Sequence, residues 1–295
     1  MPLKFRGTAD LHHYVLRGLP LLPPDLDLVV AVPRSGFIPA SLISTYLDLP
    51  LTDVDGFLAG HLLRSASRSE VADATSPSGR DVVRRARSVL IIDDSVGHGT
   101  EMRRVRQRLE AAAEGRSLHF ATVFANPAAA SVVDVAFEFL PTGRYFSWNA
   151  MHHDGLSTAG IDADGLLWAA GGAPADRAPP LIWRPSVEVG WIVTRRGEAE
   201  RKVTEAWLAS HEIRFQRLVM PASTLASRAE EVTFKARAYR QSGSHLMLTD
   251  AREQAETIAA RTGLPVLAVS AQRMSTPSLR ARAMRVIGET VSRRR

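Results

Sequence analysis

The sequence has no cysteine among its 295 residues. This absence excludes disulfide bonds, thiolate metal sites and cysteine nucleophiles, so any metal ion must have oxygen or imidazole ligands, and Mg²⁺ is the natural candidate. No apolar run approaches the roughly 18 residues that a membrane-spanning helix requires. Residues 1–4 are followed by polar residues rather than by the apolar core of a signal peptide. These absences predict a cytoplasmic protein.

Low-complexity tracts and internal repeats are also absent, and the length and composition permit two domains. A chain of 295 residues exceeds the usual size of one core, and 45% hydrophobic residues are enough for two. The formal net charge of +6 suits phosphorylated substrates, nucleic acid or an anionic membrane without selecting among them. We expect domains over residues 1–150 and 151–275, followed by a basic helix or tail over residues 276–295.

Residues 89–100, with the sequence VLIIDDSVGHGT, are the most informative segment. The apolar residues predict a buried parallel strand, and the glycine-bearing turn presents backbone N–H groups at the start of a helix, where a phosphate is favoured. The acids Asp93 and Asp94 suit the diol of a ribose. The segment therefore predicts a ribose 5-phosphate site, and the alternative is an ordinary strand before a helix that Asp94 and Ser95 cap.

This strand, acid pair and loop resemble the signature of the type I phosphoribosyltransferases. The resemblance implies that the acids bind the ribose 2- and 3-hydroxyls and that the loop binds the 5-phosphate of phosphoribosyl pyrophosphate (PRPP). The segment departs from the family at Gly97, His98 and Glu101, where members usually carry small or hydroxyl residues. Backbone contacts to the phosphate are compatible with these differences, and Thr100 offers one hydroxyl.

A second turn with related features lies over residues 33–36, after the apolar run 29–32 and before a helical pattern that extends to residue 47. Arg34 offers a fork of donors to a diphosphate, and Gly36 permits close approach of the backbone. The turn resembles the pyrophosphate loop of the same family.

Between these segments, residues 58–87 are polar and irregular. The family places there a mobile loop that closes over the pyrophosphate, whereas a solvated basic loop is the alternative. The arginines that suit either role are Arg64, Arg68, Arg80, Arg84 and Arg85. The residues that the resemblance implies for PRPP binding are Arg34, Ser35, Gly36, Asp93, Asp94, Ser95, Val96, Gly97, His98, Gly99 and Thr100.

A different pattern begins at residues 159–165, a short strand that ends in Asp162, Ala163, Asp164 and Gly165. Two carboxylates one residue apart at the end of a strand can bind Mg²⁺, with one acid attacking phosphorus and the other moving a proton. The same pattern also occurs in turns and calcium loops.

Three later residues complete an ordered set. The strand 189–194 ends in Thr194, Lys235 opens a later helix, and the strand 246–250 ends in Asp250. The set resembles the four motifs of haloacid-dehalogenase-type phosphatases. The resemblance implies a nucleophile, a general acid and base, two phosphate-binding residues and a Mg²⁺ site. Asp162 is then the nucleophile, Asp164 the general acid and base, and Thr194 and Lys235 the phosphate-binding residues. The implied Mg²⁺ ligands are Asp162, Asp164 and Asp250.

Two alternatives and one departure accompany this resemblance. Thr194 can cap the helix expected over residues 198–210, and Lys235 can be a solvated helix residue. The family commonly has two acids in its last motif, whereas this chain has Asp250 followed by alanine. Only about 30 residues separate Asp162 from Thr194, which is too few for a large cap domain. We therefore expect a capless domain with an open site.

Residues 141–153, between the two units, concentrate aromatic, histidine and asparagine residues, which predicts a packed segment rather than a flexible linker. Its polar and aromatic side chains can line an acceptor or second phosphate site, or they can be interface core. The candidates are Arg144, Trp148, Asn149 and His152.

Together these features resemble the bacterial two-domain enzymes that install ribofuranose in surface polysaccharides. The resemblance implies transfer of 5-phosphoribosyl from PRPP to a glycan with a β-ribofuranosyl linkage, and then removal of the 5-phosphate. A lipid-linked glycan would suit residues 277–295, whose arginines and apolar residues can lie on the inner face of an anionic membrane or dock on the protein itself. We expect no nucleic-acid partner.

Two alternative functions stay open. One is a nucleobase phosphoribosyltransferase fused to a nucleotide 5′-phosphatase, and the other is a non-catalytic nucleotide-binding regulator. In each case the expected fold is α/β: a type I phosphoribosyltransferase fold with a parallel sheet, followed by a Rossmannoid domain like that of the haloacid dehalogenases. Both sites are expected at the carboxyl edges of the strands.

Overall fold

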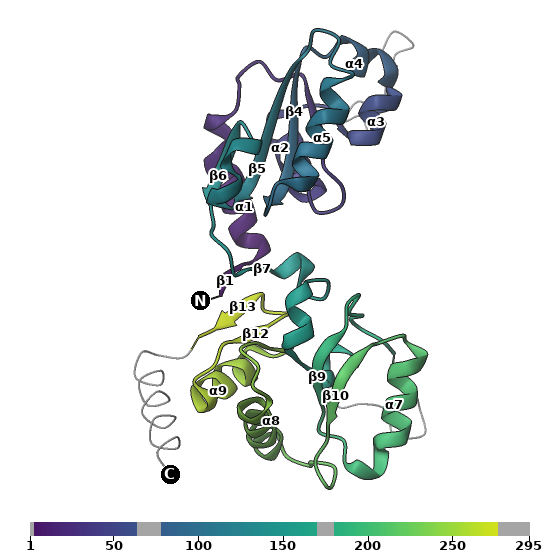
Figure 1. The fold of residues 1–295 in the computed structure, drawn as a ribbon, viewed down its shortest axis with the longest axis vertical. Coiled ribbons are helices and arrows are strands. Elements are labelled where there is room, and N and C mark those ends of the chain that lie inside the picture. Colours follow the sequence, from purple (N-terminus) through teal and green to yellow (C-terminus); the bar gives the residue numbers. More distant parts are fainter. Residues whose placement is uncertain (1–2, 64–77, 170–179, 277–295) are drawn as a thin grey trace. The chain divides into compact units, whose positions relative to one another are not determined.

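A computed structural model describes residues 3–63, 78–169 and 180–276. The chain divides into two compact units, Met1–Arg144 and Tyr145–Arg295 (Figure 1). Two of the predicted functional segments, the centre of the basic loop with Arg64 and Arg68 and the basic tail, lie outside the described residues. Among the residues that are described, no helix combines the length and the apolar character needed to cross a membrane.

The first unit contains a five-stranded parallel sheet with the strand order β3-β2-β4-β5-β6. Its central strands β2 and β4 are apolar and buried on both faces, as is usual when helices cover a parallel sheet. The strands are β2 (Leu28–Ala31), β3 (Leu51–Asp53), β4 (Ser88–Val96), β5 (Ser117–Ala125) and β6 (Val135–Phe139). A short strand β1 (Lys4–Arg6) precedes them, and the Lys4 N–H donates to the Gly143 carbonyl.

Helices cover both faces of this sheet. On one face, apolar residues of α3, α4 and α5 form one core with alternate residues of β2 and β4. The helices α1 and α2 pack against each other and against β2, β4, β5 and β6. The bounds are α1 (Thr8–Gly18), η1 (Leu19–Leu21), α2 (Phe37–Leu47), α3 (Val54–Ala59), α4 (Gly79–Arg85), α5 (Thr100–Glu110) and η2 (Pro127–Val132). The helix predicted up to residue 47 is thus confirmed.

The second unit has a six-stranded sheet with the order β10-β9-β8-β11-β12-β13, parallel except for its last strand. It is a Rossmann-like α/β domain, in agreement with the predicted parallel sheet. The strands are β8 (Gly160–Asp162), β9 (Val189–Val193), β10 (Phe215–Val219), β11 (Met247–Thr249), β12 (Val266–Ala268) and β13 (Arg273–Ser275). The short strand β7 (Arg144–Phe146) lies at the start of this unit.

The helices α8 and α9 share one core with the strands β9, β11 and β12. Ser227 and Glu230 cap the start of α8 reciprocally, which defines where the helix begins. Lys235 lies in the middle of α8 rather than at its start, so the prediction that it opens the helix is wrong. The helices are η3 (Ser147–Asn149), η4 (Asp154–Thr158), α6 (Ala163–Leu166), η5 (Glu198–Glu200), α7 (Arg201–Ser210), α8 (Arg228–Ser242) and α9 (Arg252–Thr262).

The strand orders locate one switch point in each unit. In the first unit the chain runs from β2 to β3 on one side and returns to β4 on the other; in the second it runs from β8 through β9 to β10 and returns to β11. Ligands of open α/β sheets bind outside the carboxyl ends of the strands at such points. Both predicted sites lie there, because β4 carries Asp93 and Asp94 and β8 ends at Asp162.

Candidate functional sites

In the first unit, the turn after β2 lies against the acids of β4. The Ser35 hydroxyl donates to Asp94 Oδ1 at 2.6 Å, and the Asp94 backbone N–H donates to Asp93 Oδ1 at 2.8 Å. A Cβ atom at Gly36 would lie 2.3 Å from the Val32 carbonyl oxygen, so the turn requires glycine for this close approach. The structure therefore brings together the two segments that the sequence singled out.

The carboxylates of this site are electrostatically coupled. Burial raises the pKa of Asp93 well above its ordinary value, and the adjacent carboxylates of Asp94 and Glu101 add to the effect. Asp94 is itself buried. A proton on Asp93 makes it a hydrogen-bond donor as well as an acceptor, and both roles suit a sugar diol.

The loop after β4 leads directly into a helix. Gly99 has a φ of 76° at the N-cap of α5, a conformation that favours glycine. The guanidinium of Arg103, one turn into α5, donates to the His98 carbonyl oxygen at 3.0 Å, which holds the loop. The first backbone N–H groups of α5 and the positive end of its dipole favour an anion here.

Arg144 lies beside this loop. Its Nη1 donates to the Val96 carbonyl oxygen at 3.0 Å, and a Cβ atom at Gly97 would lie 2.8 Å from its Nη2. Burial lowers the pKa of Arg144 while the Asp94 carboxylate opposes the shift, and an arginine remains charged in either case. The residue places a permanent cation next to the predicted phosphate site. The sequence identified it only as one of several candidates between the units.

In the second unit, Asp162 is completely buried and accepts hydrogen bonds on both oxygens. Its Oδ1 is 2.5 Å from Lys235 Nζ and accepts from the Asp164 backbone N–H at 3.1 Å. Its Oδ2 accepts from Thr249 Oγ1 at 3.0 Å and from Gln254 Nε2 at 2.7 Å. Burial and the neighbouring Asp164 raise the pKa of Asp162 to about 7, although Lys235 acts against the shift.

Both carboxylate oxygens of Asp164 also accept hydrogen bonds. Its Oδ1 accepts from Trp168 Nε1 at 3.1 Å and from Thr194 Oγ1 at 3.0 Å. Its Oδ2 accepts from the Arg195 backbone N–H at 2.7 Å and lies 3.0 Å from Lys235 Nζ. Burial acts against ionisation, but Lys235 and the Arg195 N–H outweigh it and hold the pKa of Asp164 below its ordinary value.

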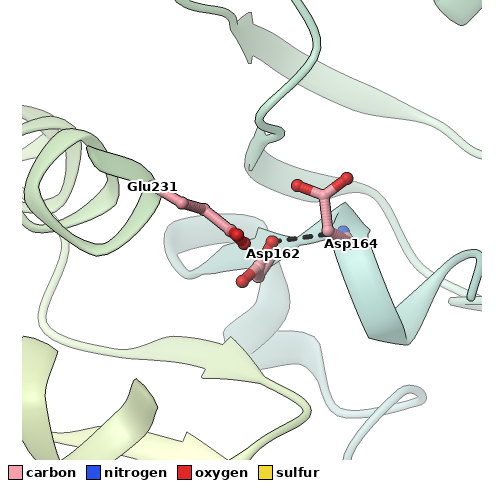
Figure 2. A group of neighbouring side chains, drawn as sticks. All are labelled: Asp162, Asp164 and Glu231. Atoms are coloured by element: carbon pink, nitrogen blue, oxygen red, sulfur yellow. Dashed lines mark hydrogen bonds between the residues drawn. The ribbon is translucent and has the colours of Figure 1, made fainter. Parts of the chain in front are cut away.

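A third carboxylate comes from α8. Figure 2 shows Glu231 pointing from its helix toward Asp162, with Asp164 on the other side. Glu231 is buried and accepts from Lys235 Nζ, four residues later on the same helix. Burial lowers the pKa of Lys235, but the three carboxylates outweigh this effect and raise it, so Lys235 is an ammonium ion.

The structure thus brings together the four residues predicted to be catalytic: Asp162, Asp164, Thr194 and Lys235. The predicted metal ligand Asp250 accepts from the Ser270 hydroxyl and lies beside the same loop, since a Cβ atom at Gly165 would be 2.8 Å from Asp250 Cβ. One carboxylate oxygen each of Asp162, Asp164 and Glu231 lies within 4.8 Å of the others, and Lys235 Nζ contacts all three carboxylates.

Two features of this site differ from the sequence-based expectations. The four predicted catalytic side chains are buried, at most 6% exposed, whereas the sequence predicts an open site. Trp168 is 1% exposed, packs edge-to-face on Trp207 and carries the guanidinium of Arg196 on its ring. The sequence patterns predicted no role for Gln254 or Glu231. For Glu231, the helical spacing of four residues from Lys235 was a signal that the two side chains meet.

Comparison with known proteins identifies the first unit. Residues 24–152 match the family described as the phosphoribosyl transferase domain. Xanthine-guanine phosphoribosyltransferases from two strains of Nitratidesulfovibrio vulgaris, DP4 and Hildenborough, are 33% and 32% identical over 106 residues, which are 36% of this chain and 57% of each relative. The chain therefore spans little more than half the length of these relatives.

Among solved structures, the Helicobacter pylori xanthine-guanine-hypoxanthine phosphoribosyltransferase has a TM-score of 0.35 at 14% identity, covering 50% of this chain and 92% of that one. A purine phosphoribosyltransferase from Pyrococcus horikoshii has a TM-score of 0.35 at 18% identity, covering 50% and 94%. By the family match, residues 24–152 form a type I phosphoribosyltransferase domain. The match ends before the acidic site of the second unit.

Proposed function

We propose that the chain transfers 5-phosphoribosyl from PRPP to a ring nitrogen of a nucleobase, and that its second unit then hydrolyses the 5′-phosphate of the nucleotide. The observation that carries the first step is the contact between Ser35 and Asp94, which joins the predicted pyrophosphate turn to the ribose acids inside the matched domain. The second step rests on the convergence of Asp162, Asp164, Thr194 and Lys235.

For the transfer, Asp93 and Asp94 bind the ribose hydroxyls and the backbone of residues 95–100 binds the 5-phosphate. Arg34 and the turn at Gly36 contact the pyrophosphate. The bond between C1 and the pyrophosphate oxygen breaks, a bond from C1 to the base nitrogen forms, and the base loses one proton. Mg²⁺ bound with PRPP would supply positive charge that neutralises part of the charge of the leaving pyrophosphate.

For the hydrolysis, an Asp162 oxygen attacks phosphorus and Asp164 protonates the departing 5′-oxygen of the nucleoside. The pKa of Asp164 is below its ordinary value in the chain alone, so this step requires the negative charge of the entering phosphate to raise that pKa. Water then releases phosphate from Asp162. Thr194 and Lys235 bind the phosphoryl oxygens in both steps. Because Trp168 is buried and its Nε1 donates to Asp164, we expect it to move when a phosphate enters.

The relatives favour a nucleobase acceptor over a glycan, since the two curated relatives are named as xanthine-guanine phosphoribosyltransferases. The glycan acceptor and the membrane contact stay predictions from the sequence. A regulator without turnover would bind PRPP but form no product. The three functions therefore predict different results in a single assay.

That assay incubates the full-length chain with PRPP, Mg²⁺ and one of xanthine, guanine, hypoxanthine or orotate, and measures pyrophosphate, phosphate and the mass of the product. We expect a purine nucleoside, with its nucleotide accumulating in Asp162→Asn. The double variant Asp93→Ala, Asp94→Ala should form no pyrophosphate but still release phosphate from added nucleotide. The control Asp55→Asn changes an exposed carboxylate of the same unit.

Two outcomes of this assay would contradict different steps of the proposal. Pyrophosphate release that requires a glycan acceptor would contradict the nucleobase step. A nucleotide that persists with the unsubstituted chain would contradict the hydrolysis, while leaving the transfer in place.

A further inference from the structure

The acceptor capacity of Asp162 is filled by donors of the chain itself. A carboxylate offers about four lone-pair sites. Lys235 Nζ and the Asp164 N–H occupy Oδ1, while Thr249 Oγ1 and Gln254 Nε2 occupy Oδ2. Gln254 directs the N–H side of its amide, which cannot coordinate a metal, at Oδ2.

The lone-pair sites of the Asp164 carboxylate are also occupied by donors of the chain. Trp168 Nε1 and Thr194 Oγ1 occupy its Oδ1, and the Arg195 N–H and Lys235 Nζ occupy its Oδ2. A divalent cation would therefore have to displace buried donors, each of which would lose its partner away from water.

Lys235 Nζ lies where an ion held by Asp162, Asp164 and Glu231 would lie. Its ammonium group has three N–H donors and contacts Asp162, Asp164 and Glu231, the same three carboxylates that approach one another within 4.8 Å. Its contacts with the two aspartates are 2.5 Å and 3.0 Å long.

We propose that Lys235 is the resident cation of the second-unit site and that this site acts on its phosphate without a divalent metal ion. The proposal deepens the proposed hydrolysis and differs from the Mg²⁺ site that the sequence resemblance implies. Glu231 is then a positioning residue that holds the ammonium between the aspartates. Mg²⁺ remains confined to the PRPP site of the first unit.

Metal binding tests the proposal directly. The full-length chain, without PRPP, is titrated with Mn²⁺ and the bound ion is counted by electron paramagnetic resonance. Asp162→Asn and Asp164→Asn provide two independent comparisons, because both change the cluster isosterically and leave the first unit intact. The control Glu256→Gln removes an exposed carboxylate of the same unit. We expect the same number of bound ions in all four proteins, whereas one ion fewer in either aspartate variant would overturn the proposal.

Phosphate release separates this proposal from the hydrolysis on which it rests. With a purine nucleoside 5′-monophosphate, we expect the rate in EDTA to be within twofold of the rate in Mg²⁺, and to disappear in Asp162→Asn. A rate that falls tenfold in EDTA and recovers with Mg²⁺ would overturn the metal-free site but retain the hydrolysis. No release in either buffer would contradict the hydrolysis, and the Mn²⁺ titration would then decide the cation.

Discussion

Ser35 Oγ donates a 2.6 Å hydrogen bond to Asp94 Oδ1, although the two residues are 59 positions apart. The bond joins the turn after β2 to the end of β4 at the switch point of the first sheet. It fixes Asp94, a proposed ribose-binding acid, relative to the proposed pyrophosphate turn, so it couples the two halves of the proposed PRPP site.

Ser35→Ala removes this donor without changing the backbone. A hydrogen bond to a charged group contributes about 1.5–3 kcal/mol, so we expect kcat/KM for PRPP to fall by about 10- to 100-fold. Initial rates of pyrophosphate release at varied PRPP measure the effect. Ser41→Ala, at an exposed position of α2, serves as the control. An unchanged kcat/KM would show that the contact does not organise the site.

Gly36→Ala places a Cβ atom 2.3 Å from the Val32 carbonyl oxygen and 2.9 Å from that of Ile92. Both neighbours are backbone atoms of the sheet and cannot move independently. We expect a loss of about 1–3 kcal/mol in the free energy of unfolding and weaker PRPP binding. Gly79→Ala is the matched control, because its Cβ atom would make only ordinary contacts. Urea denaturation and PRPP titration of both variants check the difference.

Arg144→Gln removes the cation beside the loop of residues 96–97. We expect a rise of about tenfold in KM for PRPP, because the 5-phosphate loses a nearby positive charge and the loop loses a hydrogen bond. The effect should weaken as salt concentration rises, since salt screens charge interactions. Arg108→Gln, on the exposed face of α5, is the control. A KM equal to that of the control would remove Arg144 from the site.

Asp162→Asn should stabilise the protein at high pH. The pKa of Asp162 is about 7 in the folded chain, above the ordinary value of 3.8, so the folded state binds this proton more tightly than the unfolded state. The stability that the proton provides is present below pH 4 and is lost as pH rises through about 7. We expect the variant to exceed the unsubstituted chain by about 2–4 kcal/mol at pH 8, and to match it near pH 4.

Urea denaturation of both proteins at several pH values measures this difference, and the comparison cancels the titration of groups that the two proteins share. A variant that is less stable at pH 8 would mean that the hydrogen bonds of the carboxylate outweigh its burial. Phosphate release should be absent throughout, as expected when the nucleophile is replaced.

The local sequence determined much of this protein. The apolar run before Asp93, the turn at Gly36 and the strand that ends at Asp162 are short segments whose composition specifies a buried strand or a tight turn. They identified the α/β class, the phosphoribosyltransferase domain and the aspartates of the second unit, because each signal lies within about a dozen residues of the chain.

Tertiary structure decided which of these segments meet. Gln254 donates to Asp162, 92 positions earlier in the chain, because β11 pairs with β8. The local sequence does not specify which strands pair. The burial of Lys235 among three carboxylates likewise follows from how α8 packs on the sheet. Strand pairing and desolvation depend on contacts between distant segments, so only the folded chain shows that these side chains are buried and that Lys235 contacts all three carboxylates.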